Sequence, residues 1–182
     1  MSFLELAHSR KSCRCFSTKP VPQELVQQIV EAGMIAPTGM NLQPFYFYVL
    51  NDLKRNQELF GQIEEPLKTK VPGIVNAPLN EMSQHSTYDA PCSIFCCLTN
   101  AQSNTKEFDL GIAVDHMMMA AESLGLKTLP ACLPVVAAKE HCEKAIGMED
   151  GQSLFIVLGI GYEHETVKGQ AKEKKKNLVK FL

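Results

Sequence analysis

The sequence predicts an α+β or α/β fold in which helices cover a small central sheet. Three short apolar runs, at Phe45–Leu50, 93–99 and 153–160, predict strands. The second and third runs are apolar on both faces, as expected for strands in the middle of a sheet. Helical patterns outnumber the strands and alternate with them. The 182 residues, 45% hydrophobic and 21% charged, fit a single domain over residues 1–182.

Two helices are expected before the first strand. Ser2 and Glu5 have the spacing of a capping box, which predicts a helix over residues 2–9. Pro22 is suited to the first turn of a second helix, over residues 22–36, because that turn leaves its backbone N–H groups unpaired.

Three more helices are expected after the first strand, at residues 52–60, 108–124 and 139–146. The helix at 108–124 is apolar nearly all round, which predicts burial in the core or in a subunit interface. Its methionine cluster is typical of an adaptable core. Residues 128–135 contain two prolines and are expected to be irregular.

Two segments carry weak signals. Residues 65–89 contain several prolines and many polar residues, so we expect a mobile loop region or lid, with room for a short helix. Residues 163–182 form a charged tail with a basic run.

Composition narrows the classes of function. The formal net charge of −2 and the pI of about 6.2 favour neither nucleic acid nor a membrane surface as a partner. No signal peptide and no membrane-spanning stretch is apparent, which predicts a cytoplasmic protein. The seven cysteines form no Cys-x-x-Cys motif and no zinc pattern, so we expect small buried hydrophobic residues and no metal site.

A cationic cluster follows the first helix. Arg10, Lys11, Ser12 and Arg14 stand within five positions. In an extended chain, Arg10, Ser12 and Arg14 would share one side, and two guanidinium groups with a hydroxyl suit a phosphorylated ligand. The alternative is a solvated basic turn.

A second candidate cluster lies in the loop between the second helix and the first strand. Pro37, Thr38, Gly39, Asn41 and Gln43 offer backbone N–H groups, a hydroxyl and two amides. Amides supply both donors and acceptors, as the edge of a heterocycle requires. The alternative is a connecting loop whose Asn and Gln side chains satisfy its own backbone.

These motifs resemble those of the nitroreductase family, and the resemblance covers nearly the whole chain in order. The matching stretches are Arg-x-Ser-x-Arg-x-Phe at 10–16, Ala-Pro-Thr-Gly-Met-Asn-Leu-Gln-Pro at 36–44, Asp-Ala-Pro at 89–91, Asp-Leu-Gly-Ile-Ala at 109–113 and Leu-Gly-Ile-Gly-Tyr at 158–162.

The resemblance implies a mostly antiparallel sheet and FMN held at the interface of a homodimer. Arg10 would pair with the FMN phosphate, Ser12 would bind the ribityl–phosphate region, and Arg14 would reach the flavin N1–O2 edge. Lys11 belongs to the same motif and is included as a candidate.

The resemblance also assigns residues further along the chain. Pro37, Thr38, Gly39 and Asn41 would approach the flavin from the partner subunit, with Gln43 as a further candidate of that motif. Leu129, Pro130 and Ala131 would pack along the ring edge. Lys174 and Lys176 would reach the phosphate, although the arginine usual in the family is absent here.

The activity implied is ping-pong transfer of hydride from NADH or NADPH, through FMN, to a nitroaromatic, a quinone or a related small acceptor. No catalytic side chain is expected, because the flavin carries the chemistry. Three alternatives stay open: a dehalogenase-like flavoprotein, an FMN-binding module without turnover, and a thiol redox or metal protein built on the cysteines. Residues 65–89 and the missing aromatic after the long helix depart from the family pattern.

Overall fold

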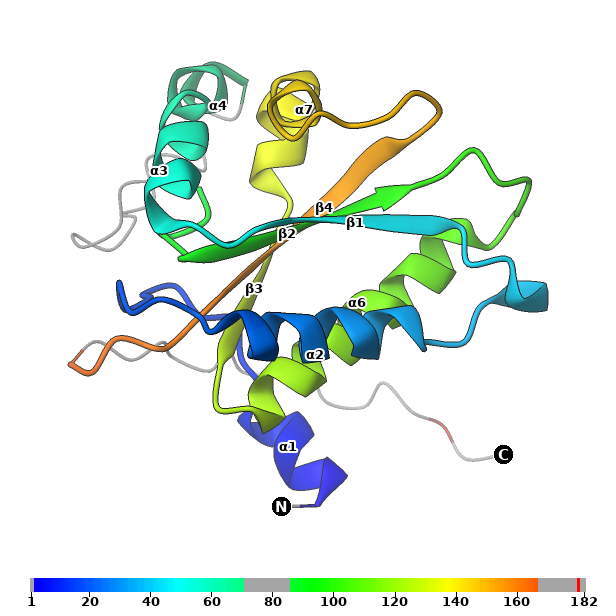
Figure 1. Ribbon diagram of the computed structural model, residues 1–182, viewed down its shortest axis with the longest axis horizontal. Coiled ribbons are helices and arrows are strands. Elements are labelled where there is room, and N and C mark those ends of the chain that lie inside the picture. Colours follow the sequence, from blue (N-terminus) through cyan, green and yellow to red (C-terminus); the bar gives the residue numbers. More distant parts are fainter. Residues whose placement is uncertain (1, 71–85, 167–179, 181–182) are drawn as a thin grey trace.

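The computed structural model describes residues 2–70, 86–166 and 180, and its centre is a four-stranded sheet (Figure 1). The strands are β1 (Phe45–Leu50), β2 (Cys92–Leu98), β3 (Lys127–Ala131) and β4 (Ser153–Gly161). They lie in the order β1-β2-β4-β3, and every neighbouring pair is antiparallel. The mixed fold and the antiparallel sheet are therefore confirmed.

Helices cover both faces of the sheet (Figure 1). One face carries α2 (Gln23–Met34) and α6 (Lys106–Ser123), which pack on each other. The other face carries α3 (Leu53–Gly61), α4 (Glu64–Lys70) and α7 (Leu133–Ala145). A short α1 (Phe3–Ser9) lies beside α6, and the 3₁₀ turn η1 (Gly39–Asn41) stands in the loop before β1.

The alternation of side chains along β2 divides the interior into two cores. Phe95 packs with Phe60 and Leu67 under α3 and α4, whereas Ile94 packs with Leu110 and other residues under α2 and α6. All seven residues of β2 are buried. A strand that is buried on both faces reads as a continuous apolar run, so the prediction for residues 93–99 is confirmed within one residue at each end.

The predicted helix boundaries are close to the observed ones. The capping box is present, because Ser2 Oγ accepts the Glu5 N–H and Glu5 Oε2 accepts the Ser2 N–H. Pro22 stands just before α2 instead of in its first turn. The long helix is confirmed, but in this chain it buries only one side, while Phe108 and His116 are exposed.

The prediction of irregular structure at 128–135 is wrong. Pro130 lies in β3, which is at the end of the strand order. The Thr128 carbonyl points away from β4 and accepts the Cys13 N–H, so Pro130, two residues on, also directs its missing N–H outward. Pro134 is tolerated in the first turn of α7. α7 begins at Leu133 and is interrupted at Ala138, where the backbone is not helical, so the predicted helix at 139–146 corresponds to its second part.

The two weakly predicted segments lie partly outside the described residues. Of 65–89, the structure describes most of α4 and a turn at 86–89, so the short helix is confirmed. Of 163–182, it describes 163–166 and residue 180. Mobility of the first segment stays a prediction. Within the described part of the chain, no helix combines the length and the apolarity that crossing a membrane requires.

Candidate functional site

The cationic cluster lies on a segment that docks against β3. The chain leaves α1 at Arg10 in an extended conformation. Ser12 then bridges to Thr128, and the Cys13 N–H donates to the Thr128 carbonyl at 2.9 Å. The alignment of this segment with β3 fixes its side chains relative to the sheet.

Burial alternates along the docked segment. Cys13 is 1% and Cys15 is 4% exposed, whereas Arg10, Ser12 and Arg14 are half-buried. Arg14 Nη1 donates to the Ser12 carbonyl at 3.4 Å. The two thiols thus anchor the segment in the core, and Ser12 and Arg14 lie on its outer side.

Lys11 is tied to the segment that follows β4. Its Nζ lies 3.7 Å from Glu163 Oε1, and both side chains are partly shielded from solvent. Phe16 bridges to the same Glu163, and the Ser17 N–H donates to the Tyr162 carbonyl at 2.8 Å. Lys11 therefore links two backbone segments, in addition to standing beside Arg10.

Residues 129–131 lie next to this cluster, on β3. The side chains of Leu129 and Ala131 belong to the core on the α7 side of the sheet. Pro130 is half-buried, and because side chains alternate along a strand, its ring lies on the opposite face of β3 from those two. Of these three residues, only Pro130 has a side chain available to a ligand lying along the outer edge of β3.

The loop before β1 is held in an unusual backbone conformation. Met40, Asn41 and Gln43 have φ values of 52°, 55° and 46°, in the left-handed region that non-glycine residues rarely adopt. The Gln43 N–H donates to Thr38 Oγ1 at 3.1 Å, and Gln43 Nε2 donates to Asn41 Oδ1 at 3.4 Å. The loop thus satisfies part of its own polar groups, as the alternative interpretation predicted, while Asn41 and Gln43 stay exposed.

A buried carboxylate on α6 binds the backbone of this loop. Asp109 is 2% exposed, and its Oδ1 accepts the Gly39 N–H at 3.2 Å. Its Oδ2 accepts the Thr105 hydroxyl at 3.3 Å. A Cβ on Gly39 would lie 2.9 Å from Thr105 Oγ1, so the approach of the loop to α6 requires glycine. Asp109 begins the Asp-Leu-Gly-Ile-Ala motif at 109–113 and had no predicted role, although an acid in a mostly apolar helix is a usable signal.

The structure does not bring the two clusters together within one chain. Residues 37–43 follow the C-terminal end of α2, whereas residues 10–14 lie toward its other end (Figure 1). Twelve helical residues span roughly 18 Å. Pro37 and the exposed loop residues therefore face a different region of the surface from Arg10. Lys174 and Lys176 lie outside the described residues.

The cysteines behave as buried hydrophobic residues. All seven are free, and only Cys132 is exposed. Burial raises the pKa of Cys13 to about 11 and that of Cys92 to about 12. These thiols are protonated at neutral pH, and a thiol redox protein needs an accessible thiolate. The geometry therefore gives no support to a thiol redox site at the six buried cysteines.

Comparisons with known proteins agree on the family. The pattern of the Nitroreductase family matches residues 7–162. A protein of Methanothermobacter thermautotrophicus, provisionally named NADH dehydrogenase/NAD(P)H nitroreductase, is 27% identical over 91% of this chain and 79% of its own. The iodotyrosine deiodinase of Thermotoga neapolitana is 25% identical over 87% of each chain.

A solved structure gives the same result for the fold. The nitroreductase of Bacteroides fragilis, crystallised with bound FMN, superimposes with a TM-score of 0.84 at 20% identity, over 100% of this chain and 99% of that one. Because the family pattern spans 156 of the 182 residues, counted from 7 through 162, this chain belongs to the nitroreductase family.

Proposed function

We propose that this protein is an FMN-dependent oxidoreductase that works as a homodimer and takes its electrons from NADH or NADPH. The observation that carries the proposal is the docking of Ser12 and Cys13 against Thr128 of β3, within a stretch in which Arg10, Ser12 and Arg14 are half-buried. FMN bound in the Bacteroides fragilis relative supports the same choice of cofactor.

The residues present fit a flavin mononucleotide. A guanidinium group and a hydroxyl suit a phosphate dianion, because charge-assisted hydrogen bonds are the strongest that side chains make, and a second guanidinium on the same short segment suits the polar edge of the flavin ring. In the described part of the chain, Arg10 has no carboxylate partner that would neutralise it. We assign Arg10 and Ser12 to the phosphate end and Arg14 to the N1–O2 edge of the ring.

The cofactor supplies the chemistry when bound, since it would accept hydride from NAD(P)H at N5 and pass electrons to a nitroaromatic, a quinone or a related acceptor. The protein's part is to bind and to set charge. Arg14 would offset negative charge at N1–O2, and Pro130 would lie against the ring edge. No nucleophilic side chain is required.

The surface supports a second copy of the chain as partner. Phe3, Leu4, Ile35, Met40 and Phe108 are between 66% and 88% exposed, and α1 buries none of its residues. Contiguous exposed apolar side chains mark interaction surfaces, and Met40 and Phe108 are neighbours in sequence of Gly39 and Asp109, which are hydrogen-bonded to each other. In a homodimer, the loop at 37–43 of one subunit would meet residues 10–14 of the other.

The test is direct. The purified protein should carry about one FMN per chain and should oxidise NADH or NADPH when a quinone or a nitroaromatic is supplied. Light scattering at micromolar concentration should give twice the mass of the chain. A colourless monomer that binds no added FMN would sink the proposal.

The deiodinase relative supports a second candidate, reductive removal of halogen from an aromatic ring. Halide release from a halophenol by the reduced protein, at a rate above that of quinone reduction, would favour it. FMN retention without oxidation of either nicotinamide would instead identify a binding module without turnover.

A further inference from the structure

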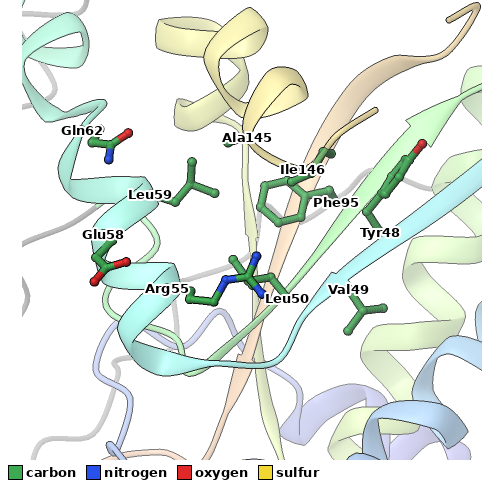
Figure 2. A pocket seen from close by; sticks show the side chains of 10 residues that line it. All are labelled: Tyr48, Val49, Leu50, Arg55, Glu58, Leu59, Gln62, Phe95, Ala145 and Ile146. Carbon is green, nitrogen blue, oxygen red and sulfur yellow. The ribbon is translucent and has the colours of Figure 1, made fainter. Parts of the chain in front are cut away.

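A cavity of about 290 Å³ lies between β1, α3 and α7, on the face of the sheet opposite α2 and α6 (Figure 2). Its buried floor is formed by Phe95 and Leu59, with Leu50 and Ile146 beside them. Three exposed side chains rim the cavity, those of Arg55 and Glu58 on α3 and of Gln62 just after it, and Tyr48 forms the β1 wall.

The walls of this cavity are fixed by contacts outside it. The Tyr48 hydroxyl donates to Gln152 Oε1 at 2.9 Å and accepts the Glu149 N–H at 3.0 Å. The Phe95 ring stacks on Phe60 with ring centroids 6.1 Å apart. Ring and hydroxyl positions are therefore set before any ligand arrives, which lowers the entropic cost of binding.

Arg55 brings an uncommitted positive charge to the cavity. Its side chain extends from α3 toward the β1 residue Leu50 (Figure 2). Over the described residues its guanidinium group forms no ion pair, while Glu58 Oε1 lies 3.9 Å from Lys54 Nζ. A guanidinium fork above an apolar floor matches a planar carboxylate attached to an apolar ring.

Glu58 narrows the choice of ligand. A second negative charge on the ligand would face this carboxylate at the rim. A monoanion avoids that repulsion, so a carboxylate fits this cavity better than a phosphate dianion.

The cavity is separate from both candidate clusters. It lies at the β1 edge of the sheet, and residues 10–14 dock at the β3 edge. Three strand spacings of about 4.8 Å put roughly 14 Å between these edges. Residues 37–43 precede the start of β1, whereas the cavity is lined by its end, Tyr48 to Leu50.

We propose that this cavity is a second binding site, which takes a small monocarboxylate with one ring. The carboxylate pairs with Arg55, and the ring lies over Phe95 and Leu59. The site is independent of the flavin and goes beyond the proposed function.

Benzoate is the probe, and the whole protein with the cofactor it carries is the sample. Methyl NMR signals of Leu50, Leu59 and Ile146 should shift saturably as benzoate is added. Arg55→Gln should weaken binding at least about tenfold, as expected for loss of a charge-assisted contact. Benzyl alcohol, which keeps the ring but has no charge, should bind wild type no better than it binds Arg55→Gln.

Two further variants separate the site from general charge effects. Lys144→Gln removes an exposed cation from α7 that does not line the cavity, and should leave benzoate affinity within twofold. Ala145→Leu adds bulk at the exposed end of α7 and should block binding. The proposal would be overturned if benzoate shifted no cavity methyl signal, or shifted only signals of residues 10–14, 37–43 or 127–131. It would also be overturned if Arg55→Gln bound benzoate as tightly as wild type.

Discussion

Asp109 on α6 accepts a hydrogen bond from the backbone N–H of Gly39, 70 residues earlier in the chain. The carboxylate is buried, and its other oxygen holds the Thr105 hydroxyl. Under the proposed function, a buried acceptor that fixes this loop would act on cofactor binding through the loop. Asp109 would then be a positioning residue of the proposed site.

Asp109→Ala should free the loop at 37–43. Loss of a hydrogen bond to a charged group costs about 1.5–3 kcal/mol, and we expect the free energy of unfolding to fall by a similar amount. FMN affinity should fall with it, measured by fluorescence quenching of added FMN. Asp115→Ala removes an exposed carboxylate from the same helix and should change neither quantity by much. If FMN affinity were unchanged in Asp109→Ala, Asp109 would not be a positioning residue.

Gly39→Ala tests the close approach of the loop to α6. The added Cβ would meet Thr105 Oγ1 at 2.9 Å, so either the loop or Thr105 must move. FMN affinity should fall several-fold in the single variant. The double variant Gly39→Ala/Thr105→Ala removes the obstructing hydroxyl and should recover part of the lost FMN affinity. A double variant no better than Gly39→Ala would show that the contact is not the cause.

Arg10→Ala should weaken FMN binding by at least about tenfold, because one charge-assisted contact contributes roughly 1.5–3 kcal/mol. FMN content after dialysis measures the effect. Lys144→Ala, which removes an exposed cation on α7, is the matched control. Equal FMN content in wild type and Arg10→Ala would contradict the assignment of the phosphate end.

Arg14→Met should lower the two-electron reduction potential of the bound flavin by some tens of millivolts, since about 30 mV corresponds to roughly 1.4 kcal/mol. A fixed cation stabilises the reduced flavin more than the oxidised flavin, because reduction places negative charge at N1–O2. Arg14→Lys keeps the charge and should recover much of the potential. Initial rates should give parallel double-reciprocal lines, and intersecting lines would exclude ping-pong turnover.

Thiol labelling checks the burial of the cysteines. At pH 8 the folded protein should react quickly at one thiol per chain, Cys132, and at seven after unfolding. Burial raises the pKa of Cys142, like that of Cys13, to about 11, so its thiolate forms only when the pH rises toward that value. Mass spectrometry after iodoacetamide treatment gives the count. Rapid labelling of Cys13 would contradict its place under the docked segment.

Local chemistry predicted much of the fold. Phe45–Leu50 was placed to the residue, because aromatic and β-branched side chains on a half-buried strand leave little ambiguity. The capping box fixed the start of α1 for a similar reason, since both of its hydrogen bonds are local.

The rest depended on contacts between distant residues. Pro130 argues against a strand unless its neighbours are known, and only the position of β3 at the sheet edge makes it acceptable. The partner of Asp109 is 70 residues away, so sequence spacing alone could not reveal it. The cavity beside Arg55 arises from packing between β1, α3 and α7, and no motif marks it.

The separation of residues 10–14 from residues 37–43 along α2 has a thermodynamic consequence under the proposed function. A cofactor that binds only across two chains stabilises the associated state by mass action. By reciprocity, whatever tightens subunit association tightens FMN binding by the same factor. Dilution should therefore release the cofactor and the partner together. Excess FMN should hold the pair intact at concentrations where the apoprotein separates.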